Sequence, residues 1–284
     1  MDIETYLDLL PENTEEINVS RKGITSLDVR RFKKLRILYC HFNKLSSLHC
    51  NEKLEVLYCH YNQLTSLPPL KNLKVLSCSY NKLSSLHLNE NLQTLNCSYN
   101  DLTSLDLNEK LEYIDCKNNL LSSLFLNKKL EFLDCNENQL TSLPPLENLQ
   151  TLICSNNHLS SLHLNNLQRL YCDHNHLTSL HCNENLQILY CYNNNLTSLH
   201  LNEKLQTLGC SNNPIYEIIS DDKQKLKILN RFRYLYYSLK FKKRFRDWLW
   251  IRIREPKIRE KYSHDYLVKN LNEDTDLDEL LKNW

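Results

Sequence analysis

The sequence predicts a repeat solenoid with a parallel β-sheet on its concave face, turns or extended segments on its convex face, and helical caps at both ends. The first observation is a unit, L-x-x-L-x-C-x-x-N-x-L-[ST]-S-L, that recurs along the chain. Its first leucines stand at positions 35, 54, 73, 92, 111, 130, 149, 167, 186 and 205, so every step is 19 residues except one of 18. The second observation is composition: the 284 residues include 59 Leu and 35 Asn, but only two Gly and no Ala. Self-similarity at a short fixed period is the sequence signature of a solenoid.

Each unit predicts one short strand followed by a return segment. In Leu57-Tyr58-Cys59, two inward side chains flank an outward one, which is the period-2 alternation of a strand. Eight or nine residues remain for the return. A helical crossover needs about ten or more, so we expect turns and extended segments. Ten full units and a degenerate one at Ile17–Leu27 predict a sheet roughly 50 Å long, at about 4.8 Å per strand.

The repeats divide the chain into three parts. We expect an N-terminal helical cap over residues 1–14, a solenoid of about eleven repeats of 19 residues over 15–219, and a basic, aromatic helical cap or tail over 220–284. After Asn213-Pro214 the period fails, and Leu226, Leu229 and Phe232 follow helical spacing. A solenoid must cover the apolar ends of its stack, so capping is the first interpretation of both terminal parts.

The C-terminal part also allows other interpretations. Its segment 223–261 holds 15 basic and 3 acidic residues, including the run KFKKRFRDWLWIRIR at Lys240–Arg254. Such a segment could contact nucleic-acid phosphates, lie on a membrane surface, or pair with acidic residues of the same chain. A nucleic-acid- or membrane-surface-associated factor is therefore the alternative function, although nucleic acid is disfavoured because the sequence has no recognised nucleic-acid-binding motif.

Ten cysteines recur at the sixth position of the unit. Zinc sites use close pairs such as C-x₂-C, and this register offers one sulfur per turn between leucines. A cysteine in that setting behaves as a small buried apolar residue, and in-register strands hold the Cβ vectors parallel, which disfavours disulfides. We therefore predict a structural ladder, with no metal and no cofactor. Its members are Cys40, Cys59, Cys78, Cys97, Cys116, Cys135, Cys154, Cys172, Cys191 and Cys210.

Ten asparagines recur at the ninth position. An inward amide at the bend after a strand can serve backbone groups that lack strand partners, both in its own turn and in the next one. We interpret this row as a second structural ladder. Its members are Asn43, Asn62, Asn81, Asn100, Asn119, Asn138, Asn157, Asn175, Asn194 and Asn213.

The unit resembles that of the leucine-rich repeat family, whose core is L-x-x-L-x-L-x-x-N/C-x-L. The resemblance covers roughly residues 15–219 and implies one short parallel strand per unit, with the strands lining one face. The period of 19 lies just below the usual 20–29, and Cys replaces an apolar residue. The unit and the end of the chain, REPKIREKY to NEDTDLDELLKNW, are also similar to short-repeat proteins of giant amoebal DNA viruses (mimivirus-like).

The outward positions vary from repeat to repeat, and solenoids bind partners on such concave surfaces. We placed the third, fifth, seventh and eighth positions of the unit on this sheet face. An aromatic band comes first, then an acidic step, then a second aromatic group. The candidate partner-binding residues are Tyr39, Phe42, Tyr58, Tyr61, Tyr80 and Tyr99 in the band, Asp115, Asp134 and Glu137 in the step, and Tyr171, Tyr190 and Tyr192 in the second group.

Two other interpretations of this surface stay open. The aromatic side chains could simply stack between strands and stabilise the sheet. The adjacent carboxylates Asp115 and Asp134 could suggest acid–base chemistry, but no nucleophile accompanies them and a flat sheet does not exclude water. With only Gly23 and Gly209, phosphate-cradling loops are also excluded. The sequence therefore favours a non-enzymatic scaffold for an unidentified protein or peptide.

The expected cellular compartment is inferred from two features that the sequence lacks, a membrane-spanning segment and a signal peptide. We find no 18-residue apolar run, and the start MDIETYLDLLPEN has no basic region before its apolar stretch, as a signal peptide would. We expect an intracellular protein, in the host cytoplasm if it is viral. The oligomeric state is not predicted.

Overall fold

The computed structural model describes residues 3–216, except 126, 146 and 164, together with 242, 247, 251, 255 and 256. The chain divides into two compact units, Met1–Leu226 and Lys227–Trp284. The first unit is described below. The helices predicted within 220–284, including the basic run Lys240–Arg254, lie outside the described residues apart from those isolated positions, so they stay predictions.

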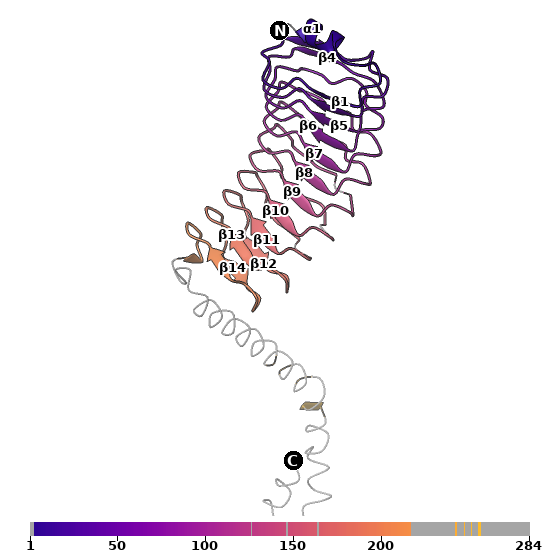
Figure 1. Cartoon of the computed structure of the whole chain (residues 1–284). Helices are drawn as coiled ribbons and strands as arrows, with labels where there is room; N and C mark the ends of the chain where they lie inside the picture. Colours follow the sequence, from indigo (N-terminus) through magenta and orange to yellow (C-terminus); the bar gives the residue numbers. More distant parts are fainter. Residues whose placement is uncertain are drawn as a thin grey trace, which may run out of the picture. The chain divides into compact units, whose positions relative to one another are not determined.

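An eleven-stranded parallel sheet forms one face of the solenoid, with its strands in chain order (Figure 1). Equivalent leucines lie opposite one another, as Leu38, Leu57 and Leu76 do on three successive strands. The strands are β1 (Glu16–Asn18), β3 (Ile37–Tyr39), β5 (Val56–Tyr58), β6 (Val75–Ser77), β7 (Thr94–Asn96), β8 (Tyr113–Asp115), β9 (Phe132–Asp134), β10 (Thr151–Ile153), β11 (Arg169–Tyr171), β13 (Ile188–Tyr190) and β15 (Thr207–Gly209). The predicted parallel-sheet solenoid is confirmed.

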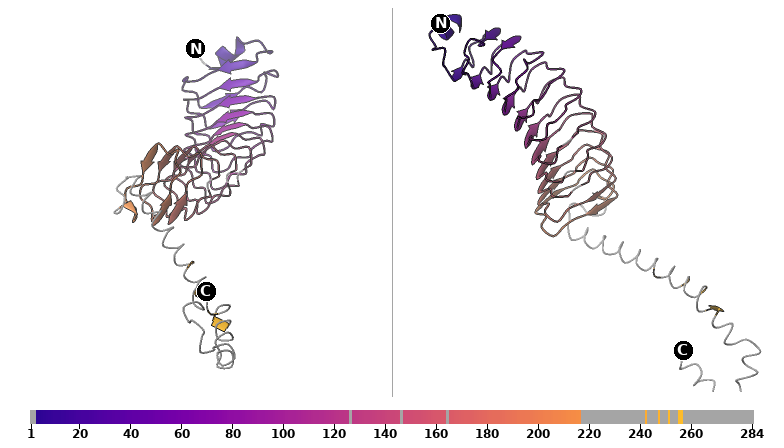
Figure 2. Two further views of the ribbon diagram at one scale, coloured as in Figure 1. Left: turned by 90° about the horizontal axis from the view of Figure 1, so that it is seen from below. Right: turned by 90° about the vertical axis from the view of Figure 1, so that its right-hand side faces the viewer.

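The convex returns are extended segments and turns, as predicted, and two pairs of returns add short ladders of their own (Figure 2). Strand β2 (Ser26–Asp28) pairs with β4 (Ser47–His49), and β12 (Ser179–His181) pairs with β14 (Ser198–His200). His181 and His200 stack there with ring centroids 4.4 Å apart. In both pairs Ser and Leu lie opposite Ser and Leu, and the third pair is Asp28 with His49 in one ladder and His181 with His200 in the other.

The interior consists of the leucines and cysteines of the unit. All ten ladder cysteines have no exposed surface, and burial raises the pKa of the thiol above the ordinary value at the eight from Cys40 to Cys172. These eight are therefore neutral thiols packed between leucines, and all ten cysteines are free of disulfides.

The ninth-position asparagines bond the turns together. Asn100 Nδ2 donates to Cys97 O of its own turn (3.0 Å) and to Cys78 O of the preceding turn (3.1 Å). Its Oδ1 accepts the Leu83 amide, also of the preceding turn, at 3.0 Å. We had expected each amide to serve its own turn and the next one. In the structure each amide instead bonds to its own turn and to the turn that precedes it in the chain.

A second row of asparagines, in the returns, was missed from the sequence. Asn108 Nδ2 donates to Asn89 O (2.7 Å) and Leu92 O (3.0 Å) of the preceding turn, while its Oδ1 accepts the Lys110 amide at 2.7 Å. Asn127 repeats the pattern one turn later. The signal was the recurring L-N after the unit, which supplies an amide at the second bend of each turn.

The N-terminal end carries the predicted helix. Helix α1 (Ile3–Asp8) buries Leu7, and Leu7 and Leu27 line one depression. The Arg31 guanidinium pairs with the Asp8 carboxylate at 2.6 Å. The helix is short, at six residues, so it covers the edge of the first turn with few side chains.

Candidate partner-binding surface

The eighth position of every repeat adopts a left-handed backbone conformation in the turn after the strand. The φ angles are Phe42 53°, Tyr61 53°, Tyr80 52°, Tyr99 53°, Asn118 52°, Glu137 52°, Asn156 53°, His174 53°, Asn193 49° and Asn212 55°. We had placed this position on the sheet face, and that was wrong. Each strand ends at the fifth position, and the chain bends so that the sixth and ninth side chains can both point inward.

Four of these side chains form a continuous stack along the edge of the sheet. Ring centroids lie 4.5 Å apart for Phe42–Tyr61, 4.2 Å for Tyr61–Tyr80 and 4.1 Å for Tyr80–Tyr99, with planes within 9–11° of parallel. Phe42, Tyr61 and Tyr80 are nevertheless 37%, 41% and 38% exposed. We call Phe42, Tyr61, Tyr80 and Tyr99 the aromatic stack.

Cations close both ends of the aromatic stack. The Arg21 guanidinium lies 4.0 Å from the centre of the Phe42 ring, and Lys117 Nζ lies 6.0 Å from the Tyr99 ring. Ring faces attract cations, so the two terminal faces are covered and the ring edges remain exposed.

The rest of the aromatic band lies on the strands themselves. Tyr39 and Tyr58 stack at 5.3 Å between centroids. His41 and His60, at the seventh position that the sequence places on the outward face, fill the space between these tyrosines and the aromatic stack, with centroids 4.6 Å apart. Burial, aided by the nearby Arg21 guanidinium, lowers the pKa of both histidines. The structure therefore joins the band into one surface, in which the histidines are held neutral.

The acidic step is not the exposed surface that we expected. Asp115 and Asp134 lie opposite one another on β8 and β9 and are each only 7% exposed. Lys117 Nζ approaches both carboxylates, at 3.7 Å and 3.9 Å. Burial raises the pKa of Asp134 to about 6, with the Asp115 carboxylate adding to the effect. The pKa of Asp115 is also raised by burial.

Large neighbours account for this burial. Tyr113 and Phe132, two residues before the aspartates on the same strands, stack with centroids 4.4 Å apart. Of the three predicted acidic residues, only Glu137 is exposed, and it accepts a hydrogen bond from Asn118 Nδ2 at 2.5 Å. The step is therefore a buried carboxylate pair with one exposed acid at its edge.

The second aromatic group forms a smaller surface near the last described turns. The centroids of Tyr171 and Tyr190 are 5.4 Å apart, and those of Tyr190 and Tyr192 are 5.6 Å apart. Tyr192 lies over Gly209, where a Cβ atom would overlap the tyrosine hydroxyl. Gly209 therefore has a packing role that its position in the sequence did not reveal.

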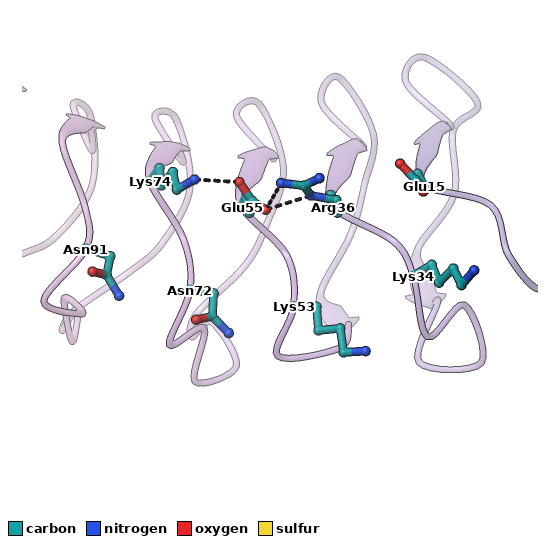
Figure 3. Close-up of a pocket in the computed structure, with 8 residues that line it drawn as sticks. All are labelled: Glu15, Lys34, Arg36, Lys53, Glu55, Asn72, Lys74 and Asn91. Atoms are coloured by element: carbon teal, nitrogen blue, oxygen red, sulfur yellow. Dashed lines mark hydrogen bonds and ion pairs between the residues drawn. The ribbon is translucent and has the colours of Figure 1, made fainter.

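A row of charges borders the aromatic band at the start of the strands (Figure 3). Glu55 lies between Arg36 and Lys74: its carboxylate accepts a hydrogen bond from Arg36 Nε at 2.6 Å and from Lys74 Nζ at 2.8 Å. These bonds lower the pKa of Glu55. With Lys34 and Lys53 the row lines an open depression of about 500 Å³. We call Lys34, Arg36, Lys53 and Lys74 the basic edge.

The basic edge was not predicted, although the sequence held the signal. Its residues occupy the second and nineteenth positions of the repeat, whereas the predicted surface uses the third, fifth, seventh and eighth positions. Within the described part of the chain, no group of three His, Cys, Asp or Glu residues is arranged to hold a metal ion. In the same part, no helix has the length and apolar character to cross a bilayer.

Comparisons with known proteins agree with this architecture. Residues 52–90 match the family model described as leucine-rich repeats in two copies, and residues 148–170 match the leucine-rich repeat model. No curated protein matches the chain. The chain therefore contains leucine-rich repeats and has the parallel-sheet solenoid of leucine-rich-repeat structures, a fold that commonly acts as a protein–protein interaction scaffold.

Two of the solved structures with a similar fold come from the bacteria Listeria monocytogenes and Yersinia pestis. The functional domain of InlJ from Listeria monocytogenes, described as including a cysteine ladder, is similar with a TM-score of 0.62 and 29% identity, over 71% of this chain and 54% of that one. YopM of Yersinia pestis, described as a leucine-rich effector protein, has a TM-score of 0.63 and 28% identity, over 73% of this chain and 62% of that one. This chain thus spans less than two thirds of either.

Proposed function

We propose that this protein is a non-enzymatic scaffold that binds a protein or peptide partner through the aromatic band on its concave face. The observation that carries the proposal is the aromatic stack, whose rings are exposed in a backbone conformation that bulky side chains disfavour. A left-handed residue with a Cβ costs roughly 1–2 kcal/mol, and Asn tolerates it best. The chain itself uses Asn there at Asn118, Asn156, Asn193 and Asn212.

Stacking offsets part of this cost, since an aromatic pair contributes about 0.5–1.5 kcal/mol. It does not explain why Phe42, Tyr61 and Tyr80 stay exposed to solvent on three successive turns. Contiguous exposed apolar surface is typical of interaction sites, and Tyr is enriched at the energetic centres of interfaces. The aromatic band has exposed apolar surface and several tyrosines, and it is held by a rigid sheet. Binding would therefore cost little conformational entropy.

The test replaces the stack with the residue that the chain already uses at this turn. In the variant Phe42→Asn, Tyr61→Asn, Tyr80→Asn, we expect the melting temperature to change by only a few degrees and partner capture to be lost. Capture is measured by panning a displayed random-peptide library against the full chain. A matched control, Asn156→His with Asn193→His and Asn212→His, should retain the enriched peptides. Equal enrichment by wild type and the stack variant would contradict the proposal, as would unfolding of that variant.

The finer features of the sequence interpretation remain proposals. These are the viral source suggested by the short repeat, an intracellular site of action, and the alternative of nucleic-acid or membrane-surface association through residues 220–284. The second aromatic group and Glu137 are proposed as secondary contacts, because they lie farther along the same side of the solenoid as the aromatic band.

A further inference from the structure

The basic edge and the aromatic band are neighbours on the same turns. Between them lies a half-buried aliphatic row, Ile37, Val56 and Val75, in which each residue directly follows a residue of the charged row. At about 3.3 Å per residue, the second and fifth positions of a turn are roughly 10 Å apart, and Lys34 and Lys53, two residues before the second position, lie up to roughly 7 Å farther out at the Cα atom. One extended segment lying on the aliphatic row could therefore reach the basic edge on one side and the tyrosines on the other.

The basic edge has four cations, whereas the depression that it lines has two carboxylates, those of Glu15 and Glu55 (Figure 3). Glu55 is already engaged by both Arg36 and Lys74. Lys34 and Lys53 are exposed on successive turns, and no acidic side chain of the described residues pairs with either of them. These two ammonium groups are available to a ligand.

The excess positive charge of this edge ends where the aromatic stack ends. Farther along the same side of the sheet, a second depression is lined by Glu112, Lys129 and Glu131 with two neutral amide side chains, and Lys110 precedes Glu112 at the nineteenth position. The edge is thus cationic beside the band and nearly neutral beyond it. Complementary charge sets the register and the choice of partner at interfaces, so this difference would hold an acidic ligand over the first repeats.

From this arrangement we infer that the occupant of the band is an acidic, apolar peptide. Successive side chains of an extended segment point to opposite sides. Its carboxylates therefore lie over Lys34 and Lys53, and its apolar side chains lie against Tyr39, Tyr58 and the aromatic stack. This inference rests on the proposed function and specifies the chemistry of the partner.

The geometry of the rings disfavours single-stranded nucleic acid as the occupant. Proteins that bind single strands offer free aromatic faces on which bases stack. Here the faces are taken by the neighbouring rings, 4.1–4.5 Å apart, and by Arg21 at the outer end. Edges and hydroxyl groups remain, and these suit apolar side chains and a peptide backbone.

The experiment uses the full chain and the peptides enriched from the displayed library. We expect these peptides to alternate Asp or Glu with aliphatic or aromatic residues. A fluorescein-labelled copy of one should bind Lys34→Glu/Lys53→Glu at least about tenfold more weakly than wild type. The control Lys44→Glu/Lys82→Glu, which reverses two exposed lysines at the tenth position, should bind within about twofold. A Glu→Gln copy of the peptide should bind weakly to wild type and be insensitive to Lys34→Glu/Lys53→Glu.

Three results would overturn the inference. They are enriched peptides without acidic residues, unchanged binding to Lys34→Glu/Lys53→Glu, and displacement of the peptide by a labelled thymidine dodecamer. Failure of the proposed function gives a different result: the variant Phe42→Asn, Tyr61→Asn, Tyr80→Asn would keep its peptides, whatever their charge.

Discussion

Both halves of the solenoid have the same left-handed turn after each strand, but they present different side chains at it. In the first half, the left-handed position after each strand carries Phe42, Tyr61, Tyr80 and Tyr99. In the second half, it carries mainly Asn, as at Asn156, Asn193 and Asn212. The φ angles are the same to within a few degrees, 52–53° against 49–55°. The side chain at this position therefore does not determine the turn, and the aromatic residues are free to serve the surface.

The ninth position, which directly follows the variable eighth position, is Asn in every full repeat. The ninth-position Asn makes the same bonds in both halves, as Asn100 and Asn194 show with two donated bonds to ladder carbonyls and one accepted bond each. Stability in a solenoid is approximately a sum over neighbouring repeats. A uniform interior thus supports a surface that changes without affecting the fold.

The largest effect that we expect tests whether the interior is uniform. Asn100→Ala and Asn194→Ala each leave one buried backbone amide, that of Leu83 or Leu177, without a partner. Each also removes one of the two side-chain hydrogen bonds that two ladder carbonyls accept, so each should lower the free energy of unfolding by about 3 kcal/mol. Urea unfolding followed by circular dichroism measures both. The exposed Gln139→Ala should cost less than about 0.5 kcal/mol. Markedly unequal costs for the two asparagines would show that the halves differ inside as well as outside.

A smaller effect concerns the middle of the sheet, where the buried carboxylates lie. The pKa of Asp134 is about 6 in the folded chain against an ordinary 3.8, so the folded state holds a proton that the unfolded state has released. This stabilisation is present below about pH 4 and is lost as the pH rises to about 6. Asp134→Asn should therefore stabilise the protein at pH 7, by about 1–3 kcal/mol.

The measurement for Asp134→Asn is the free energy of unfolding at pH 4, 5, 6 and 7. The groups that face this carboxylate are Asp115, Lys117 and Glu137, and all three are kept in the variant. If wild type and variant differ equally at every pH, burial does not raise the pKa of Asp134.

The smallest expected effect concerns His41 and His60 in the aromatic half. Its dependence on pH has the opposite sign to that of Asp134. The pKa of His41 and His60 is lowered in the folded state, so the unfolded chain takes up protons more readily below about pH 6.5. Stability contributed by this pair should fall as the pH drops from 7 to 5. His41→Gln/His60→Gln should flatten that dependence, measured by thermal unfolding at both values. A variant that keeps the full acid sensitivity would assign it to other titratable groups.

The sequence predicts the inward face of each turn and much less of the outward one. Leu57 and Cys59 could be assigned because alternation depends only on the chain itself. The burial of Asp115 and Asp134 could not, since it depends on the size of Tyr113 and Phe132 beside them. The left-handed turn was missed because Phe42 and Tyr61 argue against it, although Asn at Asn156 and Asn193 in the same register indicated it.

The single short repeat shows where this architecture tolerates changes in length. Between Leu149 and Leu167 the step is 18 residues, yet Thr151, Leu152 and Ile153 still lie opposite Arg169, Leu170 and Tyr171. The missing residue is absorbed in the return, and the strand register is unchanged. Gain or loss of a whole unit would therefore lengthen or shorten the aromatic stack by one ring without disturbing its neighbours. Unequal recombination between repeats could then alter the length of ligand that the face accommodates in a single genetic event.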